Sequence, residues 1–209
     1  MRPLFCPLQK NIRLRPGRLV HRYTRKRINI FLIKYLTYTY RYVNIYLQEI
    51  KKGNKTMNTK AIYFDMDGTI ADLYGVTDWL EMLMNGNELP YRLAKPLVRL
   101  ATLARLLNEL QENGYKIGIV SWLAKNSTAD YDARVTDAKR NWLNKHLASV
   151  KFDEIHIVSY GTPKQDIVNY PNGILFDDEK QNREKWTGKA FDEKEITEIL
   201  KKLKKRVDK

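Results

Sequence analysis

Short hydrophobic runs alternate along residues 57–209 with longer stretches whose hydrophobic positions recur at helical spacing. The runs predict buried strands at 61–64, 116–120, 154–158 and 173–176. The stretches between them predict helices at 77–85, 97–112, 126 or 127 to about 146, and 193–203. Residues 86–96 contain two prolines and are expected to form a loop. Strands that alternate with helices favour an α/β fold, a mostly parallel sheet with helices on both faces.

Polar side chains follow three of these strands, at the point where each strand ends. Asp65 and Asp67 come directly after the first strand, and Ser121 follows the second. Asp177 and Asp178 follow the fourth. Ligands of parallel sheets bind beyond the carboxyl ends of the strands, so we expect these side chains to form one site.

The two aspartates after the first strand have the chemistry that phosphoryl transfer needs. A carboxylate can attack phosphorus and form an acyl phosphate. A second carboxylate two residues on can protonate the leaving oxygen and then activate the water that hydrolyses the intermediate. Gly68 permits a tight turn whose amides can face the transferring oxygens. An isolated Asp-x-Asp pair is more often a turn or a helix cap, so the interpretation depends on the groups around it.

The remaining polar groups can supply positive charge. Mg²⁺ prefers oxygen ligands, and without a cation the carboxylates would repel a phosphate dianion. Ser121 offers a hydroxyl and Lys164 a point charge for a phosphoryl oxygen. Taken singly, these residues also suit a helix cap or a solvated surface, and Asp177-Asp178 suits the start of a helix. Their order, each near the end of a strand-helix unit, favours the site.

The net charge of +14 is concentrated in the first part of the 209-residue chain. Residues 1–56 contain 14 Lys and Arg and one acidic residue, Glu49, whereas the remainder contains 24 basic and 23 acidic residues. The globular part is nearly neutral, so the basic average gives no reason to assign it to nucleic-acid binding. The single cysteine, Cys6, excludes an intrachain disulfide and a cysteine zinc site, which fits a reducing, cytoplasmic location.

The basic leader, residues 1–56, allows three interpretations. It is rich in arginine like a transit peptide, but it lacks serine, which such peptides usually contain. It could be a basic arm for a membrane surface or nucleic acid. We favour a third interpretation, that translation starts at Met57, because residues 51–56 can be encoded by an A-rich tract that looks like a bacterial ribosome-binding site. No membrane span is expected, since Lys34 and Arg41 interrupt the most hydrophobic stretch, 28–50.

The motifs together resemble the haloacid-dehalogenase-like hydrolase superfamily over residues 61–186. Four motifs carry the resemblance: Asp65-Met66-Asp67-Gly68-Thr69, Ser121 after Ile119-Val120, Lys164, and Asp177-Asp178 after Ile174-Leu175-Phe176. The resemblance implies a Rossmann-like fold with Asp65 as nucleophile and Asp67 as general acid and base. The phosphoryl group would be held by Gly68, Thr69, Ser121 and Lys164. Mg²⁺ would be bound by Asp65, the backbone carbonyl of Asp67, and the pair Asp177-Asp178, with Asp178 favoured as the direct ligand.

Finer likenesses bear on the substrate. Thr69 after Gly68, with Asp at position 67, favours phosphatase over dehalogenase chemistry. The fourth motif, followed by Asn182 and Trp186, is similar to that of the deoxyribonucleotidases and of small phosphatases of phages and prophages. The leading hypothesis is therefore a Mg²⁺-dependent phosphomonoesterase that acts on a phosphorylated small molecule. If the enzyme is 5′(3′)-deoxyribonucleotidase-like, that molecule is a nucleotide.

Only a small cap is expected over the site, because about 28 residues, at 71–98, separate the first motif from the next long helix. An open site excludes less water, so it suits a larger substrate or a cap supplied by a second subunit in a homo-oligomer. Four aromatic residues could stack on a base, although such residues more often pack: Tyr74, Trp79, Tyr91 and Trp122.

Two other functions stay open. A nucleic-acid end-processing 3′-phosphatase would need a basic groove, which the near-neutral domain does not favour. A non-catalytic protein could keep the fold to bind metal or a partner, but it would have no need of both Asp65 and Asp67.

Overall fold

The structure, a computed structural model, describes residues 60–207. The predictions for the basic leader at 1–56 therefore lie outside the described residues. Every strand and helix predicted between 61 and 203 is present, with some ends shifted by a few residues. The α/β fold class is confirmed, because the main sheet is wholly parallel and carries helices on both faces.

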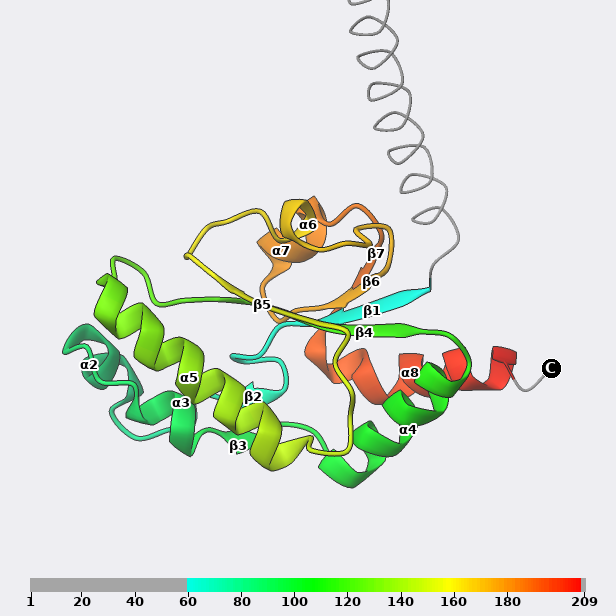
Figure 1. The fold of residues 1–209 in the computed structure, drawn as a ribbon, viewed down its shortest axis with the longest axis horizontal. Helices are drawn as coiled ribbons and strands as arrows, with labels where there is room; N and C mark the ends of the chain where they lie inside the picture. The colour runs from blue at the N-terminus through cyan, green and yellow to red at the C-terminus, as the bar shows by residue number, and fades with distance from the viewer. Residues whose placement is uncertain (1–59, 208–209) are drawn as a thin grey trace, which may run out of the picture. The chain divides into compact units, whose positions relative to one another are not determined.

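Five parallel strands form the main sheet in the order β5-β4-β1-β6-β7 (Figure 1). Their bounds are β1 Ala61–Phe64, β4 Lys116–Trp122, β5 Glu154–Val158, β6 Ile174–Phe176 and β7 Lys189–Phe191. The chain places β4 and β5 on one side of β1, then returns to place β6 and β7 on the other. The strand order thus reverses between β1 and β6. In sheets of this kind the crevice beyond the carboxyl ends at that reversal is the usual ligand site.

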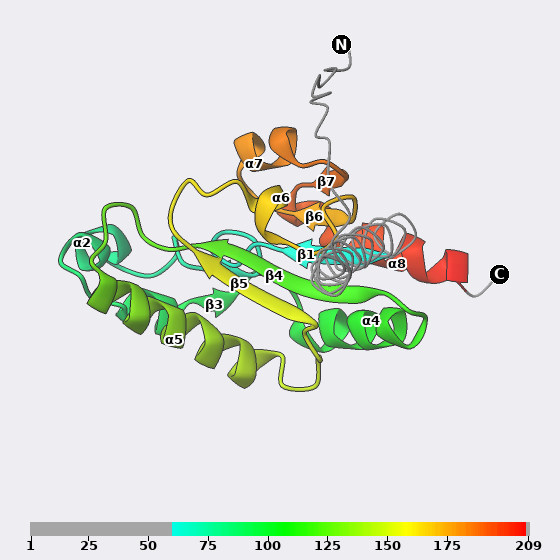
Figure 2. The ribbon, with the colours of Figure 1, turned by 45° about the horizontal axis from the view of Figure 1, so that its top comes forward.

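Helices cover the two faces of the sheet unequally (Figures 1 and 2). One face carries the long helices α4 Leu100–Glu112, α5 Ala129–His146 and α8 Ile196–Val207, the last preceded by the 3₁₀ helix η1 Glu193–Glu195. The other face carries the short helices α6 Lys164–Ile167 and α7 Lys180–Lys185. No helix among residues 60–207 is long and apolar enough to span a membrane.

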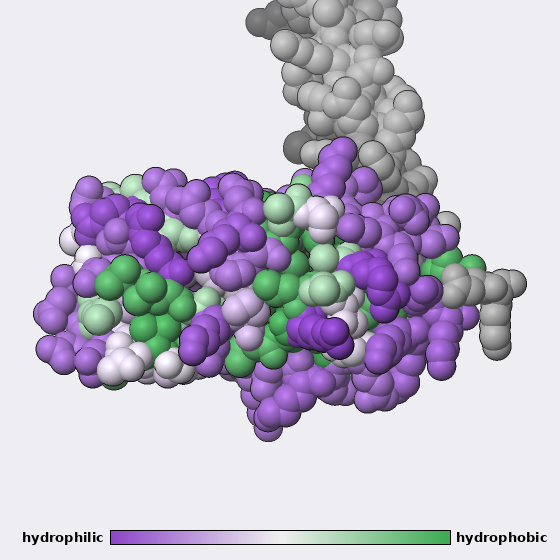
Figure 3. Space-filling view, turned by 90° about the horizontal axis from the view of Figure 1, so that it is seen from below, coloured by the Kyte–Doolittle hydropathy of each residue, from purple (hydrophilic) through white to green (hydrophobic). Residues whose placement is uncertain are grey.

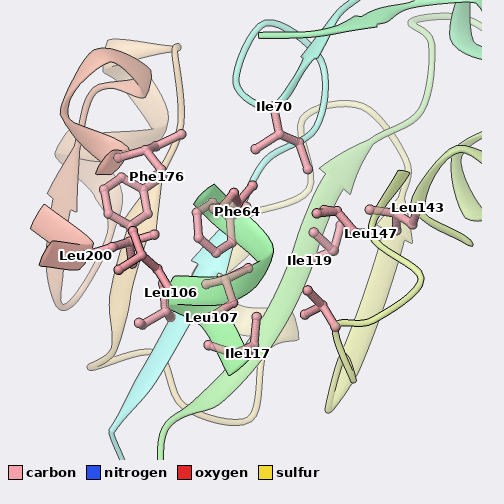
Figure 4. Packing of buried hydrophobic residues seen from close by; sticks show 14 of the residues in the cluster. Phe64, Ile70, Leu106, Leu107, Ile117, Ile119, Leu143, Leu147, Phe176 and Leu200 are labelled. Atoms are coloured by element: carbon pink, nitrogen blue, oxygen red, sulfur yellow. The ribbon is translucent and has the colours of Figure 1, made fainter. Parts of the chain in front are cut away.

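Side chains that alternate along β1 supply a core on each face, as expected for a strand buried on both sides. Ile62 and Phe64 join the larger core with α4, α5 and α8, whereas Ala61 and Tyr63 join the smaller core beneath α6 and α7. Figure 4 shows Phe64 within the larger core. Phe64 stacks on Phe176 of β6, with ring centroids 5.1 Å apart. This stack lies one residue before Asp65 and Asp177, so it fixes the two strand ends that carry the candidate site.

Residues 71–98, the predicted cap, form a short insert packed on α5. β2 Ala71–Asp72 and β3 Lys95–Pro96 pair antiparallel at its base, with α2 Trp79–Met84 and α3 Leu89–Leu93 between them. Two side chains of α5 anchor it: Tyr131 Oη donates to the Asn87 carbonyl at 3.1 Å, and Trp142 Nε1 to the Ala94 carbonyl at 2.7 Å. Figure 3 shows hydrophobic residues gathered at the end of the domain that carries this insert.

Two local predictions were wrong. Residues 86–96 are not a loop, because they contain α3 and β3; Pro90 lies in the first turn of α3, where its missing N–H leaves no helical hydrogen bond unmade. The N-cap of α5 is Thr128, whose hydroxyl accepts from the Tyr131 N–H at 3.3 Å, and not Asn126 or Ser127. Asn126 instead adopts a positive φ of 56°, and Ser127 donates to the Ala124 carbonyl.

Candidate active site

The candidate site lies at the carboxyl ends of β1 and β6, where the strand order reverses. The Asp65 N–H donates to the Phe176 carbonyl at 2.9 Å, which extends the β1–β6 ladder to the first aspartate. The Asp177 N–H likewise donates to the Phe191 carbonyl of β7 at 3.2 Å. Both aspartates are therefore set by strand backbone and not by a free loop, which fixes their separation.

A tight turn follows Asp65. The Met66 carbonyl accepts from the N–H groups of residues 69, 70 and 71, at 3.2, 3.0 and 2.8 Å, while the Met66 side chain is buried in the core. Gly68 adopts a φ of +74°, in the left-handed region. A Cβ at Gly68 would lie 2.5 Å from Asp178 Oδ2 and 2.6 Å from the Tyr74 ring. The turn therefore requires glycine for its conformation and for its close approach to Asp178.

Thr69 joins this turn to the loop after β6. Its buried hydroxyl donates to Asp178 Oδ1 at 3.1 Å and accepts from the Asp178 N–H at 3.0 Å. A hydroxyl has one proton to donate, so these bonds commit it to Asp178. The phosphate-binding role predicted for Thr69 stays a prediction, whereas its contacts are those of a residue that positions Asp178.

Three carboxylates converge in this crevice. Asp65, Asp177 and Asp178 each offer an oxygen within 4.8 Å of the others, and Asp65 and Asp177 are buried. Asp65 Oδ1 is buried and accepts no hydrogen bond from the residues described. Three carboxylates this close repel one another, and the single ammonium of Lys164 offsets only part of that charge, so the set fits a hard divalent cation such as Mg²⁺. The Asp67 carboxylate is not part of this cluster, and the predicted ligation through its backbone carbonyl stays a prediction.

The pKa values of these groups reflect their crowding. Burial, followed by the charges of Asp65 and Asp177, raises the pKa of Asp178 to about 7. Burial also raises the pKa of Asp177 to about 6, with the Asp65 charge adding to the effect and Lys164 opposing it. Such shifts mean that the folded protein resists placing several negative charges here, a repulsion that a bound cation would relieve.

Lys164 lies between two of the aspartates. It is buried, its Nζ donates to Asp177 Oδ2 at 2.6 Å, and it lies 3.1 Å from Asp65 Oδ1, outside hydrogen-bonding geometry. Burial disfavours the charged form of Lys164, but the charges of Asp65 and Asp177 outweigh this effect and raise its pKa. Since an ammonium has three N–H donors, at least one stays available for a phosphoryl oxygen.

A second buried lysine, which the sequence analysis did not identify, holds the other two predicted residues. Lys139 of α5 donates from Nζ to Asp67 Oδ2 at 2.6 Å, to Ser121 Oγ at 2.9 Å and to the Trp122 carbonyl at 2.6 Å. Burial raises the pKa of Asp67, Lys139 lowers it, and the Asp65 charge raises it, with a net increase. Ser121 lies beneath the crevice with its side chain fully buried.

The sequence carried a signal for Lys139. The buried face of α5 is formed by positions at helical spacing, Val135, Ala138, Lys139, Trp142 and Leu143. A lysine among these apolar positions is unusual, because charged side chains are rarely fully buried unless they are paired. Asn182 was noted only for its family likeness; its Nδ2 donates to both oxygens of Asp177, at 3.1 and 3.2 Å. Arg183 donates to the carbonyls of Asp177 and Asp178, at 2.7 and 2.6 Å, and no motif pointed to it.

A cavity of about 450 Å³ is lined by two of the aspartates, Asp65 and Asp67. Its other charged or amide side chains are those of Lys125, Asn126, Glu179 and Asn182. Its other walls are mainly aromatic and aliphatic: Tyr74, Trp79, Tyr91, Trp122, Tyr160, Leu73, Leu80, Leu83, Met84 and Leu123. The four aromatic residues singled out in the sequence therefore all line it. The volume lies within the range of small-molecule sites, and the insert supplies much of the wall.

Comparison with protein-family models found no match, and comparison with curated proteins found none. Among solved structures, the chain is similar to the crystal structure of D,D-heptose 1,7-bisphosphate phosphatase from Burkholderia Thailandensis. The two are 14% identical, with a TM-score of 0.37, over 60% of this chain and 70% of that chain. A likeness at this level is too weak to assign a function, which must be judged from the geometry of the site itself.

Proposed function

We propose that this protein is a Mg²⁺-dependent phosphomonoesterase of the haloacid-dehalogenase type that acts through an aspartyl-phosphate intermediate. One observation carries the proposal: Asp65 lines the cavity at the reversal of the strand order, and its Oδ1 lies 3.1 Å from the Lys164 ammonium. Around it stand an ammonium, a carboxylate cluster suited to a cation, and a second carboxylate two residues on. Nucleophilic catalysis of phosphoryl transfer needs this combination.

In the first step, an oxygen of Asp65 attacks phosphorus and the bond from phosphorus to the ester oxygen breaks. Asp67, whose pKa is raised chiefly by burial, gives a proton to the leaving oxygen, so the alcohol departs neutral. Lys164 can donate to a phosphoryl oxygen while it stays paired with Asp177. Bound Mg²⁺, held by Asp65, Asp177 and Asp178, would supply positive charge that lets a phosphate dianion enter an acidic crevice.

In the second step, the same groups reverse their roles. Asp67, now a carboxylate, takes a proton from water, whose oxygen attacks the phosphorus of the aspartyl phosphate. The bond from phosphorus to Asp65 breaks, inorganic phosphate leaves, and both aspartates return to their starting states. Division into two steps lets one carboxylate act first as acid and then as base.

The cavity supports a nucleotide as the phosphate ester. Trp79 and Trp122 line the cavity, where an aromatic ring can stack on a base, and a phosphate would lie beside Asp65 on the same cavity. The volume of about 450 Å³ suits a nucleoside monophosphate better than a nucleic-acid strand. The 5′(3′)-deoxyribonucleotidase-like activity is therefore the version of the function that we favour.

The test is release of inorganic phosphate by the full chain with Mg²⁺, from ribo- and deoxyribonucleoside monophosphates and from a 3′-phosphorylated oligonucleotide. We expect release from the monophosphates to stop with a chelator and to fall at least about 10³-fold in Asp65→Asn. Asp166→Asn, which changes an exposed aspartate of α6, is the control and should retain activity.

The other outcomes of this phosphate-release test favour other functions. Preference for the oligonucleotide would favour the end-processing 3′-phosphatase. Absence of release from every ester, in a folded protein that binds Mg²⁺, would overturn the enzymatic function and favour the non-catalytic binding protein. A cytoplasmic location and self-association stay predictions; a monomer in solution scattering that retains full activity would exclude a cap supplied by a second subunit.

A further inference from the structure

Lys139 carries a charge deep in the protein and does not line the cavity. Its side chain is 1% exposed, and it lies on the apolar face of α5. Transfer of an ammonium from water into a protein interior is costly, and a hydrophobic residue of similar volume often serves the fold as well or better. Stability alone therefore gives a weak reason for a lysine here, and its contacts suggest another.

The contacts of Lys139 use all of its hydrogen-bonding capacity. An ammonium has three N–H donors, and Lys139 has three acceptors within 2.9 Å: Asp67 Oδ2, Ser121 Oγ and the Trp122 carbonyl. The Tyr91 ring covers a further side, with its centroid 5.1 Å from Nζ. No donor is left for a substrate, so Lys139 differs from Lys164, which has one to spare.

We propose that Lys139 is a positioning residue that aims Asp67 at the leaving oxygen of the substrate, an inference that rests on the proposed phosphomonoesterase function. Because Lys139 occupies Oδ2 of Asp67, the proton that this residue transfers is carried on Oδ1. Asp67 lines the cavity, so Oδ1 is the oxygen that is free to meet the ester. Without Lys139, the carboxyl can rotate about its side-chain torsions, and the fraction with the acid in place falls.

The same ammonium sets the direction of Ser121. The hydroxyl oxygen of Ser121 accepts from Lys139, so the Ser121 proton points away from this ammonium. Lys139 also donates to the Trp122 carbonyl at the end of β4. This bond joins α5 to the strand that carries Ser121 and Trp122. One side chain thus fixes the acid and a candidate phosphate ligand from two different strand ends.

Dependence on the leaving group separates this role from a merely structural one. An alkyl phosphate, such as a nucleoside monophosphate, needs protonation of its leaving oxygen, whereas 4-nitrophenyl phosphate releases a stable phenolate without help. In Lys139→Met we expect kcat/KM to fall by about 10²-fold or more for the nucleotide and by less than about 10-fold for 4-nitrophenyl phosphate. Asp67→Asn should give the same pattern, and adding Lys139→Met to it should cost little more, since the lysine acts through that residue.

Two further variants separate the role of Lys139 from a general effect of substitution on the fold. Lys145→Met, at an exposed position of the same helix, should change neither rate. If Lys139→Met shows no cooperative unfolding transition, Lys139→Gln, which keeps two donors without the charge, takes its place and should show the same selectivity to a smaller degree. Equal losses on the two esters, or full additivity with Asp67→Asn, would overturn the role of Lys139 and leave the phosphomonoesterase function standing. If the folded wild type released phosphate from neither ester, the function itself would fall, and the role of Lys139 with it.

Discussion

At the scale of single residues, the candidate site depends on close contacts that tolerate little change. Gly68 is the clearest example, because its positive φ and its approach to Asp178 and Tyr74 each require the absence of a side chain. The Asp-x-Asp-Gly order thus has a structural meaning here: the glycine lets the loop after β6 come within reach of Thr69. Gly68 therefore supports the carboxylate cluster through its backbone conformation, which leaves room for Asp178.

A Gly68→Ala substitution should therefore damage both the fold and the site. Left-handed backbone costs a non-glycine residue about 1–2 kcal/mol, and a Cβ 2.5 Å from Asp178 Oδ2 adds a clash that must displace a candidate metal ligand. We expect a loss of unfolding free energy of about 2–4 kcal/mol in urea titration, together with loss of phosphate release.

Gly114→Ala is the matched control. Gly114 also has a positive φ, of +83°, but a Cβ there would meet no atom within 4 Å. This variant should lose about 1–2 kcal/mol of stability and keep its activity. Equal losses in the two variants, with activity intact in both, would mean that Asp178 and Tyr74 yield freely and that Gly68 is needed only for its backbone.

At the scale of elements, the sequence predicted those whose periodicity extends over enough residues. The long helices α4, α5 and α8 were found because their apolar positions repeat, and the strands β1, β4, β5 and β6 because apolar residues cluster in each of them. The elements α6, α7 and β7 were not predicted, because their sequences KQDI, KQNREK and KAF hold too few apolar residues to form a run or a period. The equally short α2 and β6 are mostly apolar and were predicted. α3 was hidden by its proline, which suggests a loop unless the first turn of a helix is considered.

Some residues of the candidate site could likewise be predicted from the sequence, and others could not. Asp65, Asp177, Asp178 and Lys164 could be brought together from the sequence because parallel strands end at one edge of a sheet. Lys139 could not be placed, because its partners come from two strand ends, and only the packing of α5 on the sheet brings it to them. Predicting such a residue requires the register of a helix on a sheet, which no local pattern contains.

The carboxylate cluster at the ends of β1 and β6 leads to a prediction about how a metal affects stability. A ligand that binds only the folded state stabilises it, by about 2.7 kcal/mol at 100 times its dissociation constant. We expect Mg²⁺ to raise the unfolding temperature of the wild type and to have no such effect on Asp178→Asn. In the absence of metal, this variant should be at least as stable as the wild type, because it removes one of three mutually repelling carboxylates.

Thermal unfolding with and without Mg²⁺ measures both effects, and Asp166→Asn again serves as the control. A variant that is destabilised without metal and still responds to Mg²⁺ would show that Asp178 holds the loop through Thr69 and is not a ligand. Relative to the wild type, Asp178→Asn should be at least as stable without Mg²⁺ and less stable with it. This comparison needs no enzymatic assay.

At the scale of the whole molecule, the cavity is a joint product of the sheet and the insert. The sheet supplies the aspartates, and the insert, fixed to α5 by Tyr131 and Trp142, supplies Trp79 and the apolar wall. Six of the seven exposed large hydrophobic side chains among residues 60–207 belong to this insert: Tyr74, Leu80, Met84, Leu89, Leu93 and Leu97. Exposed apolar surface beside a polar centre is typical of a site that binds something.

Because the insert forms the apolar wall of the cavity and the sheet carries the aspartates, we expect substitutions in the insert to change KM more than kcat. Trp79 lines the cavity and packs edge-on against Tyr74, with ring centroids 5.0 Å apart. Loss of base stacking costs about 1–3 kcal/mol, so we expect Trp79→Ala to raise KM for a nucleoside monophosphate by about 10-fold or more. The KM for glycerol phosphate, which has no ring to stack, should change little, and so should kcat for either ester.

Leu93→Ala, at an exposed position of α3 outside the cavity wall, controls for general loosening of the insert. If Trp79→Ala raised both KM values equally, the tryptophan would serve the shape of the insert and not the base. If it lowered kcat for both esters with KM unchanged, the insert would act on the reacting groups through water exclusion, because a looser wall admits solvent to Asp65 and Asp67. Steady-state kinetics on the two esters therefore locates the role of the insert in binding, in architecture or in the chemical step.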